Sequence, residues 1–155
     1  LEDFERVLDI NVKGVFLATQ LAAKSMIKYD IEGSIVNMSS INAQVAIPGI
    51  PAYCASKGGV MQLTKSAAIA LSKYKIRVNC VIPGAVPSEL NIRAVLFSED
   101  ENEARMNAIA PLHVLERIGK AQEVAEAIEY LMNAEWTTGS SLVVDGGLSL
   151  GMSNF

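Results

Sequence analysis

Apolar and polar positions follow two different spacings along the chain, and these spacings predict its helices and strands. From residue 2 to about residue 29, apolar side chains recur every three or four positions, which predicts an amphipathic helix. The same spacing predicts a second helix from about 51 to 74 and a third near 120–133. Short apolar runs bounded by glycine, serine or proline predict buried strands between these helices. The runs are 33–40, 76–84 and 141–147.

The order of these elements indicates the fold class. Helices and strands alternate along the chain, which is typical of an α/β fold whose parallel sheet is covered by helices. Between 88 and 118 the pattern is irregular to helical, and the acidic stretch SEDENEA resembles a capped helix start. Three strands are few for a parallel sheet, and the helical pattern is already running at Glu2. We therefore interpret the chain as part of a longer domain.

Composition and charge exclude several classes of protein. Half of the residues are hydrophobic and 19% are charged, which excludes a disordered chain. The net charge is -4 and no cluster of lysine or arginine stands out, which argues against a nucleic-acid partner. The charge-free run 33–56 contains asparagines, serines and prolines, so it indicates buried core and not a membrane segment. Because no signal-peptide pattern is found, we expect a cytoplasmic protein.

The residues that could bind a metal ion are few and scattered. Cys54 and Cys80 are far apart, and the single histidine, His113, cannot complete a zinc set with them. We therefore expect no metal site and two reduced thiols that fill small positions in the core.

One pair of side chains suggests proton-transfer chemistry. Tyr53 and Lys57 are four residues apart in a predicted helix, so they share one face. An ammonium beside a phenol favours the phenolate, so we expect the tyrosine pKa to be lowered from about 10 toward neutral pH. Ser40 ends a predicted strand, and the carboxyl ends of parallel strands are where ligands bind. Taken alone, a tyrosine–lysine pair with this spacing is more typical of an ordinary helix surface than of a catalytic site.

Five segments of the chain carry a family resemblance in their order and spacing. They are DINVKGVF, GSIVNMSS, AYCASKGGVMQLTK, IRVNCVIPG and TGSSLVVDGG. Together they resemble the short-chain dehydrogenase/reductase family along the whole chain. The resemblance implies a Rossmann-like, doubly wound parallel sheet, of which the chain supplies the C-terminal portion with three strands and their flanking helices.

The resemblance also implies a role for each candidate site residue. Tyr53 would be the general acid/base, and Lys57 would lower the pKa of Tyr53 and bind the nicotinamide ribose. Ser40, thirteen residues before Tyr53, would orient the substrate, with its neighbour Ser39 as the weaker candidate. Asn11 would help to hold a water molecule in a proton relay to the lysine.

A second group of residues would bind the cofactor, which the resemblance implies is NAD or NADP. Tyr53 and Lys57 belong to this group, and the others follow a predicted strand. They are Pro83, Gly84, Val86 and Ser88. The simpler alternative is that 83–88 is only a strand-ending turn.

The sequence departs from the family in two places. The phosphate-binding motif TGxxxGxG, the charged residue after the second strand and the NNAG motif are absent, so residues 1–155 match only the C-terminal part of a single NAD(P)-binding domain. The loop PLHVLERIG is longer than is common in the family. Four side chains near it could touch a substrate, although each is more typical of a surface or packing position. They are Arg93, Arg105, Met106 and His113.

These observations favour an oxidoreductase that transfers a hydride between NAD(P)(H) and a secondary alcohol or ketone. The substrate could be a sugar, a steroid, an acyl thioester or a simple ketone. By resemblance the protein would be a homo-oligomer, a dimer or tetramer assembled through the two long helices and the C-terminal strand. The alternative is a non-catalytic chain that serves as an interaction or assembly module. We expect the 155 residues alone to be inactive or nearly so.

Overall fold

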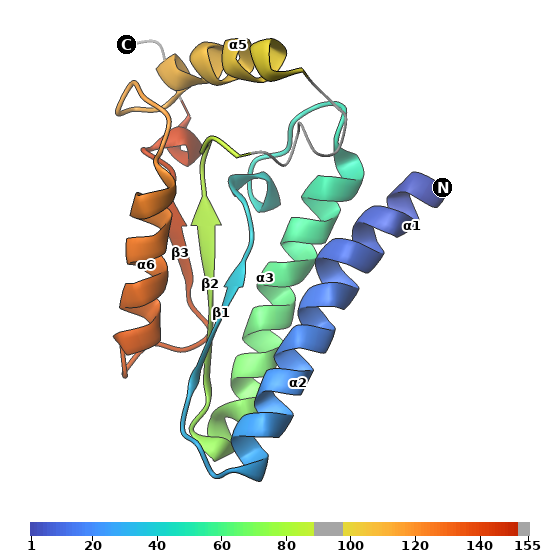
Figure 1. Ribbon diagram of the computed structural model, residues 1–155, viewed down its shortest axis with the longest axis vertical. Helices are drawn as coiled ribbons and strands as arrows, with labels where there is room; N and C mark the ends of the chain where they lie inside the picture. Colours follow the sequence, from blue (N-terminus) through green and yellow to red (C-terminus); the bar gives the residue numbers. More distant parts are fainter. Residues whose placement is uncertain (89–97, 152–155) are drawn as a thin grey trace.

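Three parallel strands form a single sheet in the computed structural model, which describes residues 1–88 and 98–151 (Figure 1). The strands are β1 (Ser34–Met38), β2 (Arg77–Pro83) and β3 (Ser141–Val144). Their order in space is β1-β2-β3, so β2 is hydrogen-bonded on both sides. The α/β fold with a parallel sheet that the sequence predicts is confirmed.

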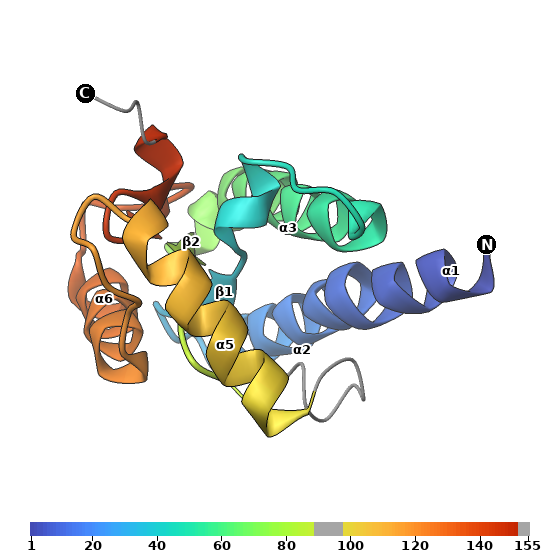
Figure 2. The same cartoon turned by 90° about the horizontal axis from the view of Figure 1, so that it is seen from above.

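Helices cover both faces of this sheet (Figures 1 and 2). They are α1 (Glu2–Leu8), α2 (Gly14–Lys28), α3 (Pro51–Leu71), α5 (Glu99–Ile109) and α6 (Ala121–Asn133). The helices α2 and α3 pack side by side on one face, and α6 lies on the other. The helix α5 crosses above the carboxyl ends of the strands, and Ser98 and Glu101 form the capping box that the acidic stretch predicts.

The core forms on both sides of β2. Cys80 and Ile82 pack toward α3, whereas Val81 between them packs toward α6, because successive side chains of a strand point to opposite faces. The residues from Val78 to Ile82 are fully buried, as predicted. The outer strands are less buried than predicted: Met38 of β1 is 40% exposed and Val143 of β3 is 37% exposed. Only the central strand of the described sheet has a neighbour on each edge and a helix on each face.

Two polar side chains of β2 fix the connection between α6 and β3. The Asn79 side chain is fully buried; its Nδ2 donates to Thr137 O at 2.8 Å, and its Oδ1 accepts from Ser140 N at 3.1 Å. The Arg77 guanidinium donates to two backbone carbonyls at the end of α6, at 2.9 and 2.6 Å. These carbonyls have no partner within the helix, so the guanidinium satisfies them. Trp136, in the same connection, is completely exposed.

The long N-terminal helix is not regular, although its periodicity predicts one uninterrupted helix. A π-helical turn at Asp9–Lys13 separates α1 from α2. Such turns insert one extra residue and often occur at functional sites. Asn11 lies at the centre of this turn.

Among residues 1–88 and 98–151, none of the helices combines the length and the apolar character that crossing a bilayer requires.

Candidate functional site

Three of the predicted site residues meet at the carboxyl end of β1. Ser40 follows this strand, and its hydroxyl caps a short helical turn by accepting from Asn42 N at 3.2 Å. Tyr53 lies in the first turn of α3, which begins with Pro51, a residue that favours the first position of a helix. The Ser40 hydroxyl interacts with the Tyr53 phenol. The turn between β1 and α3 thus brings a serine and a tyrosine into contact.

The electrostatic environment of Tyr53 differs from the sequence-based prediction. Burial raises the pKa of the phenol, and the interaction with the Ser40 hydroxyl lowers it only in part. The predicted lowering by the lysine is therefore wrong for this structure. The desolvation of a half-buried phenol outweighs its hydrogen bond, so Tyr53 is protonated at neutral pH.

Lys57 lies one helical turn further along α3 and reaches back over β1. Its ammonium donates to Met38 O at 3.2 Å and lies 5.5 Å from the centre of the Tyr53 ring. Burial lowers the pKa of Lys57, and the nearby Cys80 opposes this shift. The ammonium is therefore anchored to a backbone carbonyl at the edge of the sheet, with the phenol ring beside it.

The two neighbouring serines make different contacts. Ser39 is 3% exposed, and its hydroxyl donates to Lys57 O at 2.8 Å. It therefore ties α3 to the end of β1. The Ser40 hydroxyl instead interacts with the Tyr53 phenol. The family resemblance ranked Ser40 above Ser39, and this order stays a prediction.

Asn11 reaches the site through a residue that sequence reasoning missed. Its Nδ2 donates to Ser56 Oγ at 3.0 Å, and Ser56 Oγ donates to Tyr53 O at 2.7 Å. Ser56 is fully buried. The signal in the sequence was the position of Ser56, three residues after Tyr53 on a helix, where a hydroxyl can return to the backbone.

The four predicted cofactor-binding residues of the second group lie at the neighbouring strand end. Pro83 ends β2, and Gly84 and Val86 are half-buried after it, whereas Ser88 is exposed. Because β1 and β2 are parallel, these residues share one edge of the sheet with Ser40. At Gly84 any added Cβ would lie 2.8 Å from the Asp145 Cα, so this close approach to the chain after β3 requires glycine.

Comparisons with known proteins show the family of the chain. The family described as enoyl-(acyl carrier protein) reductase matches residues 1–149 of the chain. The chain is 36% identical over 152 residues to glucose 1-dehydrogenase 2 of Bacillus subtilis, and 37% identical over 148 residues to carbonyl reductase [NADPH] 2 of Sus scrofa. The chain belongs to the short-chain dehydrogenase/reductase family. The resemblance of its five segments is thereby confirmed.

Solved structures of short-chain dehydrogenases/reductases share its fold. A 4-hydroxyisoleucine dehydrogenase complexed with NADH matches 96% of the chain with a TM-score of 0.85 and 36% identity. Acetoin dehydrogenase from Enterobacter cloacae matches all of it with a TM-score of 0.84 and 32% identity. The chain spans 60% and 58% of these two proteins. It spans 57% of the Bacillus enzyme and 59% of the Sus scrofa enzyme while 97% and 94% of its own length is matched.

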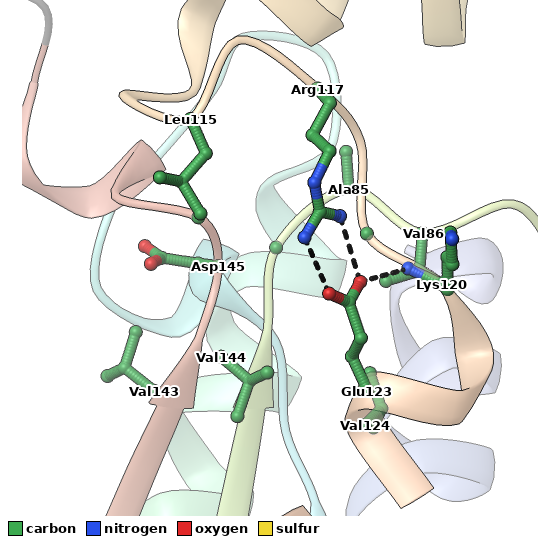
Figure 3. A pocket seen from close by; sticks show the side chains of 13 residues that line it. Ala85, Val86, Leu115, Arg117, Lys120, Glu123, Val124, Val143, Val144 and Asp145 are labelled. Atoms are coloured by element: carbon green, nitrogen blue, oxygen red, sulfur yellow. Dashed lines mark hydrogen bonds and ion pairs between the residues drawn. The ribbon is translucent and has the colours of Figure 1, made fainter.

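A hollow lies beside the ends of β2 and β3 in this short-chain dehydrogenase/reductase, on the side of α6 (Figure 3). Within it the Arg117 guanidinium faces the Glu123 carboxylate and donates to both oxygens, at 2.9 and 2.6 Å. Glu123 also accepts from Lys120 N at 2.8 Å. The carboxylate thus caps the start of α6 and pairs with a cation.

We expect this ion pair to make the stability of the protein dependent on acid. The Arg117 guanidinium, with the Lys120 N–H, lowers the pKa of Glu123 from 4.5 to about 2. A carboxylate whose pKa is lowered by folding stabilises the folded protein above pH 4.5, and this stabilisation is lost as the pH falls toward 2. The free energy of unfolding, followed by circular dichroism, should decrease across this window, and Glu123→Gln should flatten the decrease. Glu126→Gln removes one charge from the same helix and is the control; an equal effect of both variants would contradict the expectation.

The four residues that the sequence analysis named as possible substrate contacts lie in different places. Arg93 lies outside the described residues. Arg105 and Met106 belong to α5, the helix above the strand ends. His113 is buried, at 1% exposure, and does not face solvent.

Proposed function

We propose that the protein containing this chain is an oxidoreductase that transfers a hydride between NAD(P)(H) and a secondary alcohol or ketone. The observation that carries this proposal is the contact between Ser40 and Tyr53, with the Lys57 ammonium beside the phenol at the carboxyl end of β1. A glucose dehydrogenase and an NADPH carbonyl reductase among the relatives support it. The NADH complex of a similar structure supports the cofactor class.

The protonated state of Tyr53 suits it to carbonyl reduction. Because burial raises its pKa, the phenol holds its proton at neutral pH and can donate it to the carbonyl oxygen as negative charge develops there. The Ser40 hydroxyl, beside the phenol, orients the same oxygen by a hydrogen bond. In the opposite direction the phenolate removes the proton of the alcohol. The bound nicotinamide supplies or accepts the hydride in this chemistry.

The donors at this edge of the sheet fit a nicotinamide ribose. An ammonium carries three N–H groups, and the contact to Met38 O uses one of those of Lys57. Two remain for ribose hydroxyls, and the Tyr53 ring lies beside the ammonium. Pro83, Gly84, Val86 and Ser88 would line the nicotinamide at the end of β2. The water-mediated relay implied for Asn11 stays a prediction, and its contact to Ser56 adds a positioning role.

Replacement of Ser40 by alanine should lower kcat about tenfold to a hundredfold, the effect of losing one hydrogen bond to a developing charge. The matched variant is Ser39→Ala, one residue earlier, which removes a bond to the backbone of α3 instead. Steady-state kinetics with NAD(P)H should show the loss in kcat for Ser40→Ala, and mainly lower thermal stability for Ser39→Ala. A larger kcat loss for Ser39→Ala would reverse the assignment.

The experiment that tests the proposed function begins with the gene. Sequencing upstream of the Leu1 codon should reveal an in-frame TGxxxGxG segment, and the full-length product should oxidise NAD(P)H with ketone substrates. Its sequence would also indicate the preference for NAD or NADP. The 155 residues lack that segment, so we expect them to show little activity alone.

The non-catalytic alternative makes the opposite prediction. Within the described residues β1 pairs on one edge only, so it could accept a strand from another chain. An assembly module would neither bind nor oxidise NAD(P)H and would copurify with a partner protein. That result from the product of the complete gene would replace the oxidoreductase proposal.

We also propose that the protein is a homo-oligomer, either a dimer or a tetramer. Large apolar side chains on the outer surfaces of α2 and α3 are exposed, with Leu21 at 66% and Ile69 at 79%. Contacts through these helices and β3 would cover them. The cytoplasmic location stays a prediction.

A further inference from the structure

The single histidine of the chain, His113, lies in the loop that follows α5. It is buried against the segment Gly84–Val86, which is proposed to contact the nicotinamide. His113 is 1% exposed. It belongs to the loop that is longer than is common in the family, where the sequence indicated a surface or packing residue. Gly146 lies against the ring, since a Cβ added there would be 3.4 Å from its Cδ2.

The contacts of the ring define its tautomer. The Nε2 atom accepts a hydrogen bond from Ala85 N at 3.4 Å, and a backbone N–H can only donate. Nε2 must therefore carry a lone pair, which places the hydrogen on Nδ1. Nδ1 lies 3.1 Å from Ile109 O and 3.3 Å from Ala110 O, and both oxygens can only accept. A neutral imidazole thus joins the end of α5 to the segment after β2.

Both backbone groups of Ala85 are held by this same loop. His113 accepts from its N–H, and its carbonyl accepts from Gly119 N at 2.8 Å. One residue earlier, Gly84 N donates to Val144 O at 3.0 Å. The segment between Gly84 and Val86 is therefore fixed to β3 on one side and to the loop 113–119 on the other.

We propose that His113 is a positioning residue. By accepting a hydrogen bond from Ala85 N at Nε2, it fixes the position of the segment Gly84–Val86 relative to the nicotinamide. This inference rests on the proposed function, because it gives that segment a cofactor to contact. The ring touches neither the cofactor nor Tyr53 in this role. It acts through the backbone of Ala85, and the loop that carries it couples the end of α5 to the cofactor segment.

Two substitutions of His113 distinguish the contributions of its two ring nitrogens. In asparagine the side-chain amide reaches about as far as Nδ1, and in glutamine it reaches about as far as Nε2. His113→Gln can therefore still accept from Ala85 N–H, whereas His113→Asn keeps only the contact toward the end of α5. In the full-length enzyme, His113→Asn should raise the KM and the Kd for NAD(P)H about tenfold, the effect of one lost hydrogen bond, with a smaller change in kcat. His113→Gln should restore both constants to within about threefold of the wild type.

A purely structural histidine would give a different result. If it only fills space, both variants lower the thermal midpoint and change the cofactor constants equally, which would overturn the proposal. If the wild-type enzyme does not bind or turn over NAD(P)H, the proposed function fails instead.

Amide hydrogen exchange at Ala85 tests the hydrogen bond without any catalysis. Its N–H should exchange slowly in the wild type and in His113→Gln, and about tenfold faster in His113→Asn. Equal exchange in all three proteins would overturn the inference. Should the asparagine variant fail to fold, rapid exchange of Ala85 in the folded wild type would overturn it as well.

Discussion

Replacement of Tyr53 by phenylalanine is expected to lower kcat/KM of the full-length enzyme about 10²- to 10⁴-fold, the range that a single general acid/base contributes. Phenylalanine keeps the ring that lies beside Lys57 but removes the hydroxyl that interacts with Ser40. The loss should therefore appear in kcat, measured by NAD(P)H oxidation. The thermal midpoint should change little.

The raised pKa of Tyr53 also predicts how the rate of carbonyl reduction depends on pH. Burial raises its pKa, so the protonated form that carbonyl reduction needs is present at neutral pH and is lost only above that raised pKa. The rate of reduction should stay level through neutral pH and fall in strong alkali. Tyr29→Phe alters a tyrosine that is 63% exposed and is the control. Retention of activity within about threefold in Tyr53→Phe would remove Tyr53 from the mechanism.

The second large effect is expected in stability, from Asn79→Ala at the centre of the sheet. The substitution removes both the donor to Thr137 O and the acceptor for Ser140 N from a fully buried position. Backbone groups left without partners and the space left by the side chain should together lower the free energy of unfolding by about 2–3 kcal/mol. Urea unfolding followed by circular dichroism measures this change.

A matched asparagine elsewhere controls for the chemistry of the substitution. Asn133 donates to Glu129 O at 2.8 Å from an exposed position at the end of α6. Asn133→Ala should change the free energy of unfolding by no more than about 0.5 kcal/mol, because water replaces the lost contact. Similar losses in both variants would mean that the buried contacts of Asn79 contribute little.

Much of the fold could be predicted from local patterns. The run from Val78 to Ile82 is apolar except for Asn79 and is followed by a proline and a glycine, which predicted the buried strand that the structure contains. Ser98 and Glu101 have the spacing of a capping box and form one. Such features depend only on residues close in sequence, which periodicity and spacing can detect.

The features that the sequence did not predict depend on distant contacts. A π-helical turn shifts the helix by one residue without changing the spacing enough to be recognised, so Asn11 was placed in a regular helix. The raised pKa of Tyr53 depends on how deeply α3 buries the ring, which spacing to Lys57 does not measure. His113 was assigned to the surface or to packing because the partners of its ring, Ala85 and Ile109, come from two different elements.

The connection between α6 and β3 offers a place to attach a reporter. The side chains of Arg77 and Asn79 hold it by hydrogen bonds to backbone carbonyls and to one backbone N–H. These bonds do not depend on the identity of most side chains in the connection. Trp136 points entirely into solvent. A fluorophore introduced at position 136 should leave the sheet intact, and its signal would then follow the approach of other molecules to this edge of the protein.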